Sequence, residues 1–147
     1  MSYDIHQKGH MSCPNTVLES IKPTYLFILE TNGILLGYDK KYVEDLSTFE
    51  NLHVRLCLKG ADSEEFTFFT GAKTGFEYQL VALQYLRDSH MNYNIALVSV
   101  HQEKKQNFFQ RLVEMDLEKV MIEEEEIKLY PMLRKRLQKE KLLHYFE

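Results

Sequence analysis

The chain has 147 residues, of which 44% are hydrophobic and 27% are charged, and its formal net charge is −4. These values are ordinary for one globular domain with a buried core. The negative balance argues against binding of nucleic acid, and no apolar run reaches the ~20 residues of a membrane-spanning helix. Residues 1–24 lack the apolar centre of a signal peptide, so a cytoplasmic protein with no membrane or nucleic-acid partner is expected.

The two cysteines, Cys13 and Cys57, limit the redox and metal chemistry. A structural disulfide is not expected in the cytosol, and two sulfurs do not make a four-sulfur metal site. His6, His10 and Cys13 are spaced so that a helical turn could bring them to one metal ion. Residues 1–13 are more simply interpreted as a flexible N-terminal tail, because chain ends are usually poorly ordered, and no metal site is expected.

The clearest predicted element is a strand over residues 25–31, which reads Y-L-F-I-L-E-T and is followed by the turn dipeptide N-G. A continuous apolar run bounded by polar residues is typical of a strand that is covered on both faces. Glu30, Thr31 and Asn32 fall at its carboxyl end. In open α/β sheets and in (β/α)8 barrels ligands are held at that end, so these three are candidate binding residues.

The remainder of residues 14–147 predicts a single α/β domain. In chain order we expect a helix over 14–21, the strand over 25–31, a helix over 39–47, a strand over 53–58, helices over 62–69 and 76–88, a strand over 93–100, a helix over 104–120, a strand over 127–130 and a helix from Pro131. The acidic run 123–126 is interpreted as a solvated segment unless one of its acids pairs with Arg55. The connections are long enough for parallel pairing. We therefore expect about four parallel strands with crossover helices, which is half of a TIM-type barrel.

The strand over 53–58 alternates between apolar and polar residues. Val54 and Leu56 share one face, whereas Arg55, Cys57 and Lys59 share the other. A parallel sheet that is wrapped by helices has apolar residues on both faces. The polar face therefore lines a polar site, or else it belongs to an edge strand that faces water, and the pattern does not separate the two readings.

Four short phrases occur in an order that resembles a known superfamily. They are E-T-N-G at 30–33, V-R-L-C-L-K-G at 54–60, T-G-A at 70–72 and L-Y-P at 129–131. Together they resemble the middle and C-terminal portion of a radical SAM enzyme, over about residues 15–147. The resemblance implies a partial barrel of parallel strands that holds a [4Fe–4S] cluster and S-adenosylmethionine at its carboxyl-end mouth. It implies that adenosylmethionine lies near residues at three strand ends, namely Glu30, Thr31, Asn32, Cys57, Lys59 and Ser99.

The chain departs from that family at the motif that defines it. No three cysteines have the spacing C-x3-C-x2-C, so a [4Fe–4S] cluster is expected only if a partner chain supplies ligands. We expect a truncated radical SAM-like protein, derived from an S-adenosylmethionine and iron–sulfur enzyme, that is not catalytically competent alone. The alternatives are a non-catalytic α/β interaction or scaffold module and an unrelated α/β domain. Because a half-barrel has an open edge at its first strand, a homo-oligomer or a partner chain that completes the sheet is also expected.

Overall fold

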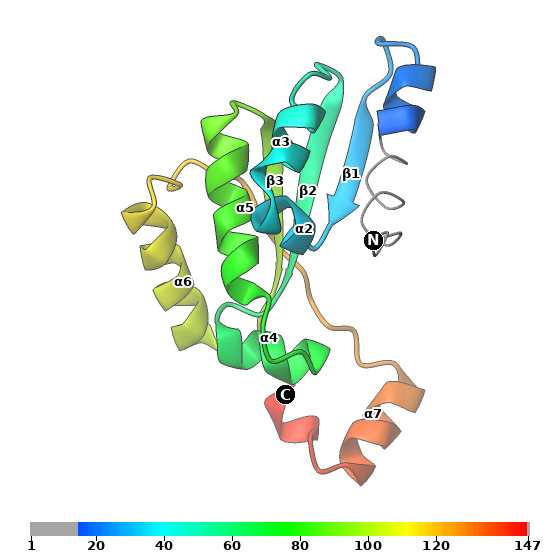
Figure 1. Ribbon diagram of the computed structural model, residues 1–147. Helices are drawn as coiled ribbons and strands as arrows, with labels where there is room; N and C mark the ends of the chain where they lie inside the picture. The colour runs from blue at the N-terminus through cyan, green and yellow to red at the C-terminus, as the bar shows by residue number, and fades with distance from the viewer. Residues whose placement is uncertain (1–14, 147) are drawn as a thin grey trace, which may run out of the picture.

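The computed structural model describes residues 15–146, and its centre is one sheet of four parallel strands in the order β1-β2-β3-β4 (Figure 1). The strands are β1 (Phe27–Thr31), β2 (Leu52–Lys59), β3 (Asn92–Val98) and β4 (Ile122–Glu124). The connecting helices are α2 (Ile34–Tyr38), α3 (Lys40–Leu46), α4 (Ser63–Thr70), α5 (Phe76–Asp88) and α6 (Gln102–Glu114), and a helix over 15–20 precedes β1. The predicted α/β class with four parallel strands is confirmed. The predicted tail lies outside the described residues.

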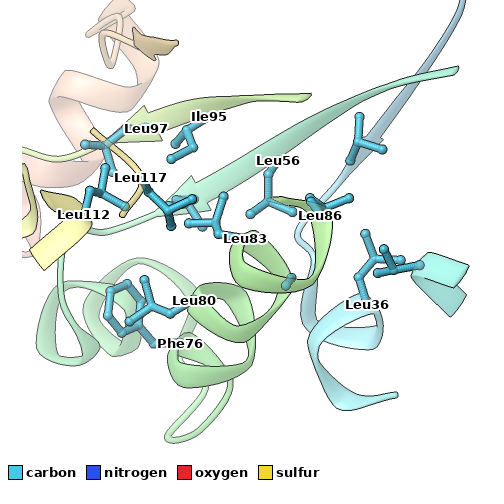
Figure 2. Close-up of a cluster of buried hydrophobic side chains, with 14 of the residues drawn as sticks. Leu36, Leu56, Phe76, Leu80, Leu83, Leu86, Ile95, Leu97, Leu112 and Leu117 are labelled. Atoms are coloured by element: carbon cyan, nitrogen blue, oxygen red, sulfur yellow. The ribbon is translucent and has the colours of Figure 1, made fainter. Parts of the chain in front are cut away.

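The connecting helices cover one face of the sheet, where the core lies (Figure 1). Alternation within β2 sends four residues toward these helices, namely Leu52, Val54, Leu56 and Leu58, and each is at most 2% exposed. Four apolar residues of α5 meet them: Phe76, Leu80, Leu83 and Leu86 are buried against the strands (Figure 2). Burial of one such side chain contributes about 1.5–3 kcal/mol, so this single apolar layer is what holds the helices on the sheet.

Two glycines shape the connection between β1 and α3. Gly33 adopts φ 74°, a left-handed conformation that suits glycine, and it turns the chain from β1 into α2. Gly37 lies against α5, where a Cβ atom would overlap the carbonyl oxygen of Tyr78. The helix α2 was missing from the sequence prediction, because five residues are too few to display a helical period.

The fourth strand was predicted at 127–130, and this was wrong, because β4 is formed by Ile122–Glu124 inside the acidic run. The amide of Ile95 donates to the carbonyl of Met121 (2.9 Å), and the amide of Glu125 donates to the carbonyl of Leu97 (2.8 Å). Acidic residues are tolerated in this edge strand because cationic side chains beside them compensate the negative charge. The helix predicted over 104–120 likewise ends early, at Glu114.

After residue 124 the chain leaves the sheet and forms α7 (Pro131–Lys139) and a short 3-10 helix, η1 (Leu143–Tyr145). Pro131 opens α7 as predicted, because its missing amide hydrogen costs nothing in the first helical turn. Aromatic rings attach η1 to α4, with ring centroids 5.3 Å apart for Phe68 and Tyr145 and 6.4 Å apart for Phe69 and Phe146. Among the described residues no helix is long and apolar enough to cross a membrane.

Candidate functional site

The candidate site lies on the face of the sheet that the connecting helices leave uncovered, here called the helix-free face (Figure 1). The register places Glu30 of β1 beside Arg55 of β2, and Arg55 in turn beside Asn94 of β3. Ala96 of β3 stands beside Glu123 of β4. Since paired residues in neighbouring strands point to the same side, the polar residues of all four strands meet on this face.

Arg55 is at the centre of a hydrogen-bonded cluster on this face. Its Nη1 donates to Glu30 Oε1 (3.1 Å), its Nη2 donates to Glu123 Oε2 (2.9 Å) and Glu125 Oε1 (2.9 Å), and its Nε donates to Glu123 Oε2 (3.1 Å). The guanidinium is suited to this role because its five N–H groups lie in one plane with a fixed fork geometry. One side chain on β2 therefore joins both edge strands of the sheet.

Neighbouring polar groups extend this cluster along β2 and β3. Asn94 is 3% exposed, and its Nδ2 donates to Glu123 Oε1 (2.9 Å). The Oδ1 atom of Asn94 lies 2.7 Å from Nε2 of His53. Lys59 donates from Nζ to Glu125 Oε2 (3.3 Å) at the carboxyl end. We call the whole cluster the Arg55 network, and its members are Glu30, His53, Arg55, Cys57, Lys59, Asn94, Glu123 and Glu125.

The electrostatics of the network favour a charged carboxylate at Glu125 and a neutral thiol at Cys57. Glu125 and Glu123 raise the pKa of Arg55 above its usual range, and Arg55, followed by Lys59, lowers the pKa of Glu125. Burial raises the pKa of the Cys57 thiol, although the nearby Arg55 cation opposes the shift. A thiol whose pKa is raised is a poor nucleophile and a poor metal ligand at neutral pH. Cys57 is thus a small neutral group, 3.7 Å from Nη1 of Arg55.

The structure brings three of the six sequence-predicted site residues together, namely Glu30, Cys57 and Lys59 in the Arg55 network. Thr31 Oγ1 instead accepts from the amide of Gly33 (3.1 Å), and Asn32 Oδ1 accepts from the amide of Ile34 (3.0 Å). These two side chains stabilise the turn after β1. The hydroxyl oxygen of Ser99 is buried, with no hydrogen-bond partner in the part of the chain that the structure describes.

The sequence does not by itself identify Arg55 as the centre of the site, nor does it single out Glu123 and Glu125 within the acidic run. The alternation of β2 predicts Arg55 on the polar face, and an ion pair between Arg55 and an acid of the run 123–126 is one of the two expectations for that run. Because the fourth strand was predicted at the wrong residues, the predicted strand register did not place those acids beside Arg55. The signal that identifies them is the period of two across 122–125, in which the side chains of Glu123 and Glu125 share one face.

A buried carboxylate also positions the mouth of the sheet. Glu65 of α4 is 2% exposed, and it accepts from the amides of Ala61 (2.8 Å), Val100 (3.0 Å) and His101 (3.3 Å). It thereby ties the loop after β2 to the loop after β3. Two cavities open at this end. One of about 680 Å³ is lined by Lys59, Phe69, Val98, Glu125, Glu126 and Ile127, and one of about 150 Å³ is lined by Glu64, Glu65, Phe68, His101, Lys104 and Tyr145.

The described residues contain no group of three or more His, Cys, Asp or Glu side chains arranged to hold a metal ion. The N-terminal group of His6, His10 and Cys13 lies outside them. Comparisons of the chain with family models, with curated proteins and with solved structures returned no match. The geometry of the helix-free face is therefore the ground on which a function is proposed.

Proposed function

We propose that this chain is a half-barrel of the radical SAM type that supplies one wall of an adenosylmethionine site and is not a complete catalyst alone. The observation that carries the proposal is the Arg55 network, which spans all four strands on the helix-free face. Strands in sequential order with every connection on one side are the arrangement found within a (β/α) barrel. A doubly wound sheet would instead reverse its strand order and carry helices on both faces.

The chemistry of the network matches the polar groups of adenosylmethionine. That molecule carries two cationic centres, ribose hydroxyl donors and one carboxylate. The side chain of Glu30 is 63% exposed and has carboxylate oxygens to accept from a hydroxyl or an ammonium group, and Lys59 is a cation for the carboxylate. Cys57 is small enough to lie beside a ribose. Thr31 and Asn32 contribute by holding the turn that places Glu30 at the strand end.

The iron–sulfur cluster that the resemblance implies does not fit the described residues. Cluster ligation requires several thiolates held together, and Cys57 is a single free thiol whose pKa is raised by burial. A cluster would thus need ligands from a partner chain. The free thiol agrees with the cytoplasmic location that forms part of the same proposal.

The direct test is isothermal calorimetry with S-adenosylmethionine. We expect binding by the wild type and a loss of roughly tenfold or more in affinity for Glu30→Ala, because a hydrogen bond to a charged group is worth about 1.5–3 kcal/mol. The matched control is Glu77→Ala: Glu77 is 68% exposed and also pairs with an arginine, Arg111, but it lies on α5. Equal affinity of the two variants would contradict the proposed role of Glu30.

A second candidate function, a non-catalytic interaction module, is favoured by apolar side chains at the edges of the helix-free face. Leu26, Ile28 and Met121 are 67%, 53% and 67% exposed. Ile28 points to this face because its register partner is His53. Such residues suit contact with a second copy or a partner chain that completes the sheet through the β1 side. If titration with adenosylmethionine gave no heat for either the wild type or Glu30→Ala, the result would favour the function as an interaction module.

A further inference from the structure

The charge of the chain is divided unevenly along its length. Residues 128–141 contain six cations and one acid, a net charge of +5, so the rest of the chain carries −9 of the total of −4. All six cations are exposed, and they are Lys128, Arg134, Lys135, Arg136, Lys139 and Lys141. The net charge of the whole chain, on which the expectation of no nucleic acid rested, conceals this basic segment.

The basic segment stands at the mouth of the half-barrel. Figure 1 shows α7 beyond the carboxyl ends of the strands, on the path that the chain takes after β4. Three residues separate Ile127, which lines the 680 Å³ cavity, from Pro131, which begins α7, so the Cα atoms of the two are at most about 14 Å apart. No residue of α7 is buried, and η1 attaches this segment to α4.

We infer that α7 and the adjacent mouth bind a single-stranded nucleic acid, with the phosphates on the basic residues and a base directed toward the cavity. Exposed lysines and arginines on one helix match a phosphate backbone in charge. Tyr130 is 66% exposed at the start of α7, and such a ring stacks on unpaired bases. The acids Glu125 and Glu126 on the cavity wall would repel phosphate but accept hydrogen bonds from a base.

Two other anionic partners fit less well. An interfacial membrane helix needs a broad apolar face, but Leu133 and Leu137 of α7 are already half-buried. A second copy could offer its acidic β4, yet Glu123 and Glu125 are bonded to Arg55. The idea that the bound strand is a substrate at the mouth of the sheet rests on the function proposed above. Binding of the strand to α7 does not depend on that function.

The test is fluorescence anisotropy with labelled single-stranded polyuridine. Contacts with about five phosphates predict that affinity falls roughly 100-fold when salt rises from about 50 to about 200 mM. We expect Lys135→Glu combined with Lys139→Glu to lower affinity at least tenfold, and the equally charged control, Lys41→Glu with Lys119→Glu on other exposed surfaces, to have little effect. No binding by the wild type at low salt, or equal losses in both double variants, would overturn the inference.

Stacking is tested separately by Tyr130→Ala, for which we expect about fivefold weaker binding or more. Its control is Tyr25→Ala, since Tyr25 is 64% exposed near β1. Binding to phosphatidylserine vesicles but not to polyuridine would overturn the inference in favour of a membrane surface. Adenosylmethionine calorimetry on the same samples separates the two proposals: absence of heat with polyuridine binding intact refutes only the function proposed above.

Discussion

At the scale of single residues, Arg55 explains how an acidic strand lies in the sheet. Its side chain is 20% exposed and has hydrogen bonds to Glu30, Glu123 and Glu125, so each of these carboxylates has a cationic partner. A partly buried charge is stable only when it is paired in this way. Removal of one member leaves another without its partner, and the network therefore acts as a unit.

The lowered pKa of Glu125 predicts a pH dependence of folding. A carboxylate whose folded-state pKa lies below its unfolded value near 4.5 contributes stability above that value, and the contribution is lost as the pH falls through the folded pKa. We expect the wild type to be more stable than Glu125→Gln at neutral pH, with the difference shrinking below about pH 4.5. Urea unfolding of both proteins across this range measures it. A difference that stays constant with pH would contradict the ion pair with Arg55.

At the scale of elements, the contact between α2 and α5 depends on a glycine that permits close approach. Gly37 is buried, and the space beyond its Cα is filled by the backbone of α5 at Tyr78. An ordinary helical glycine would be improved by alanine, by about 1 kcal/mol. Here the steric overlap works in the opposite direction, because the backbone of a packed helix cannot move aside at low cost.

We therefore predict that Gly37→Ala destabilises the protein by about 1–3 kcal/mol, the usual cost of an overpacked core. Chemical denaturation followed by circular dichroism is the measurement. Gly71→Ala is a useful comparison because Gly71 adopts φ 74° with open space around its Cα, so it reports conformational strain without overlap. A Gly37→Ala protein more stable than the wild type would show that α2 does not lie on α5 as described.

At the scale of the whole molecule, the helix-free face is the unusual feature. Parallel sheets are normally covered on both faces, whereas the described part of this chain covers one. The edge strand β1 also has backbone groups on its free side, where another strand can pair. Both features are compatible with half of a barrel, and from them we predict that a second polypeptide completes the sheet.

Sedimentation velocity tests that completion. We expect wild-type protein at high concentration to sediment as a species heavier than the 17.5 kDa chain, and Ile28→Lys to shift it toward the monomer. The control is Val113→Lys: Val113 is 49% exposed, close to the 53% of Ile28, but it lies on α6. A wild type that is monomeric at every concentration would remove the idea of self-association, and an equal shift by both variants would place the contact elsewhere.

Much of the fold could be predicted because local patterns carry it. The alternation of β2 and the apolar spacing of α5 both follow from residue periods along the chain. The site was predicted only in part. Glu30, Cys57 and Lys59 lie in the Arg55 network. The side chains of Thr31 and Asn32 instead stabilise the turn formed by the tetrapeptide E-T-N-G at 30–33.

The sequence by itself determined the α/β class, the parallel sheet and the polar face of β2, because each depends on the period of residues within one segment. Only the tertiary structure decided which strand is fourth, which face has no helices and which acids surround Arg55. Those properties depend on the pairing of β3 with both β2 and β4, which places β2 and β4 on the two sides of β3. The hydrogen bond between Arg55 and Glu125 depends on the register of the strands in three dimensions, and no local sequence pattern contains that register.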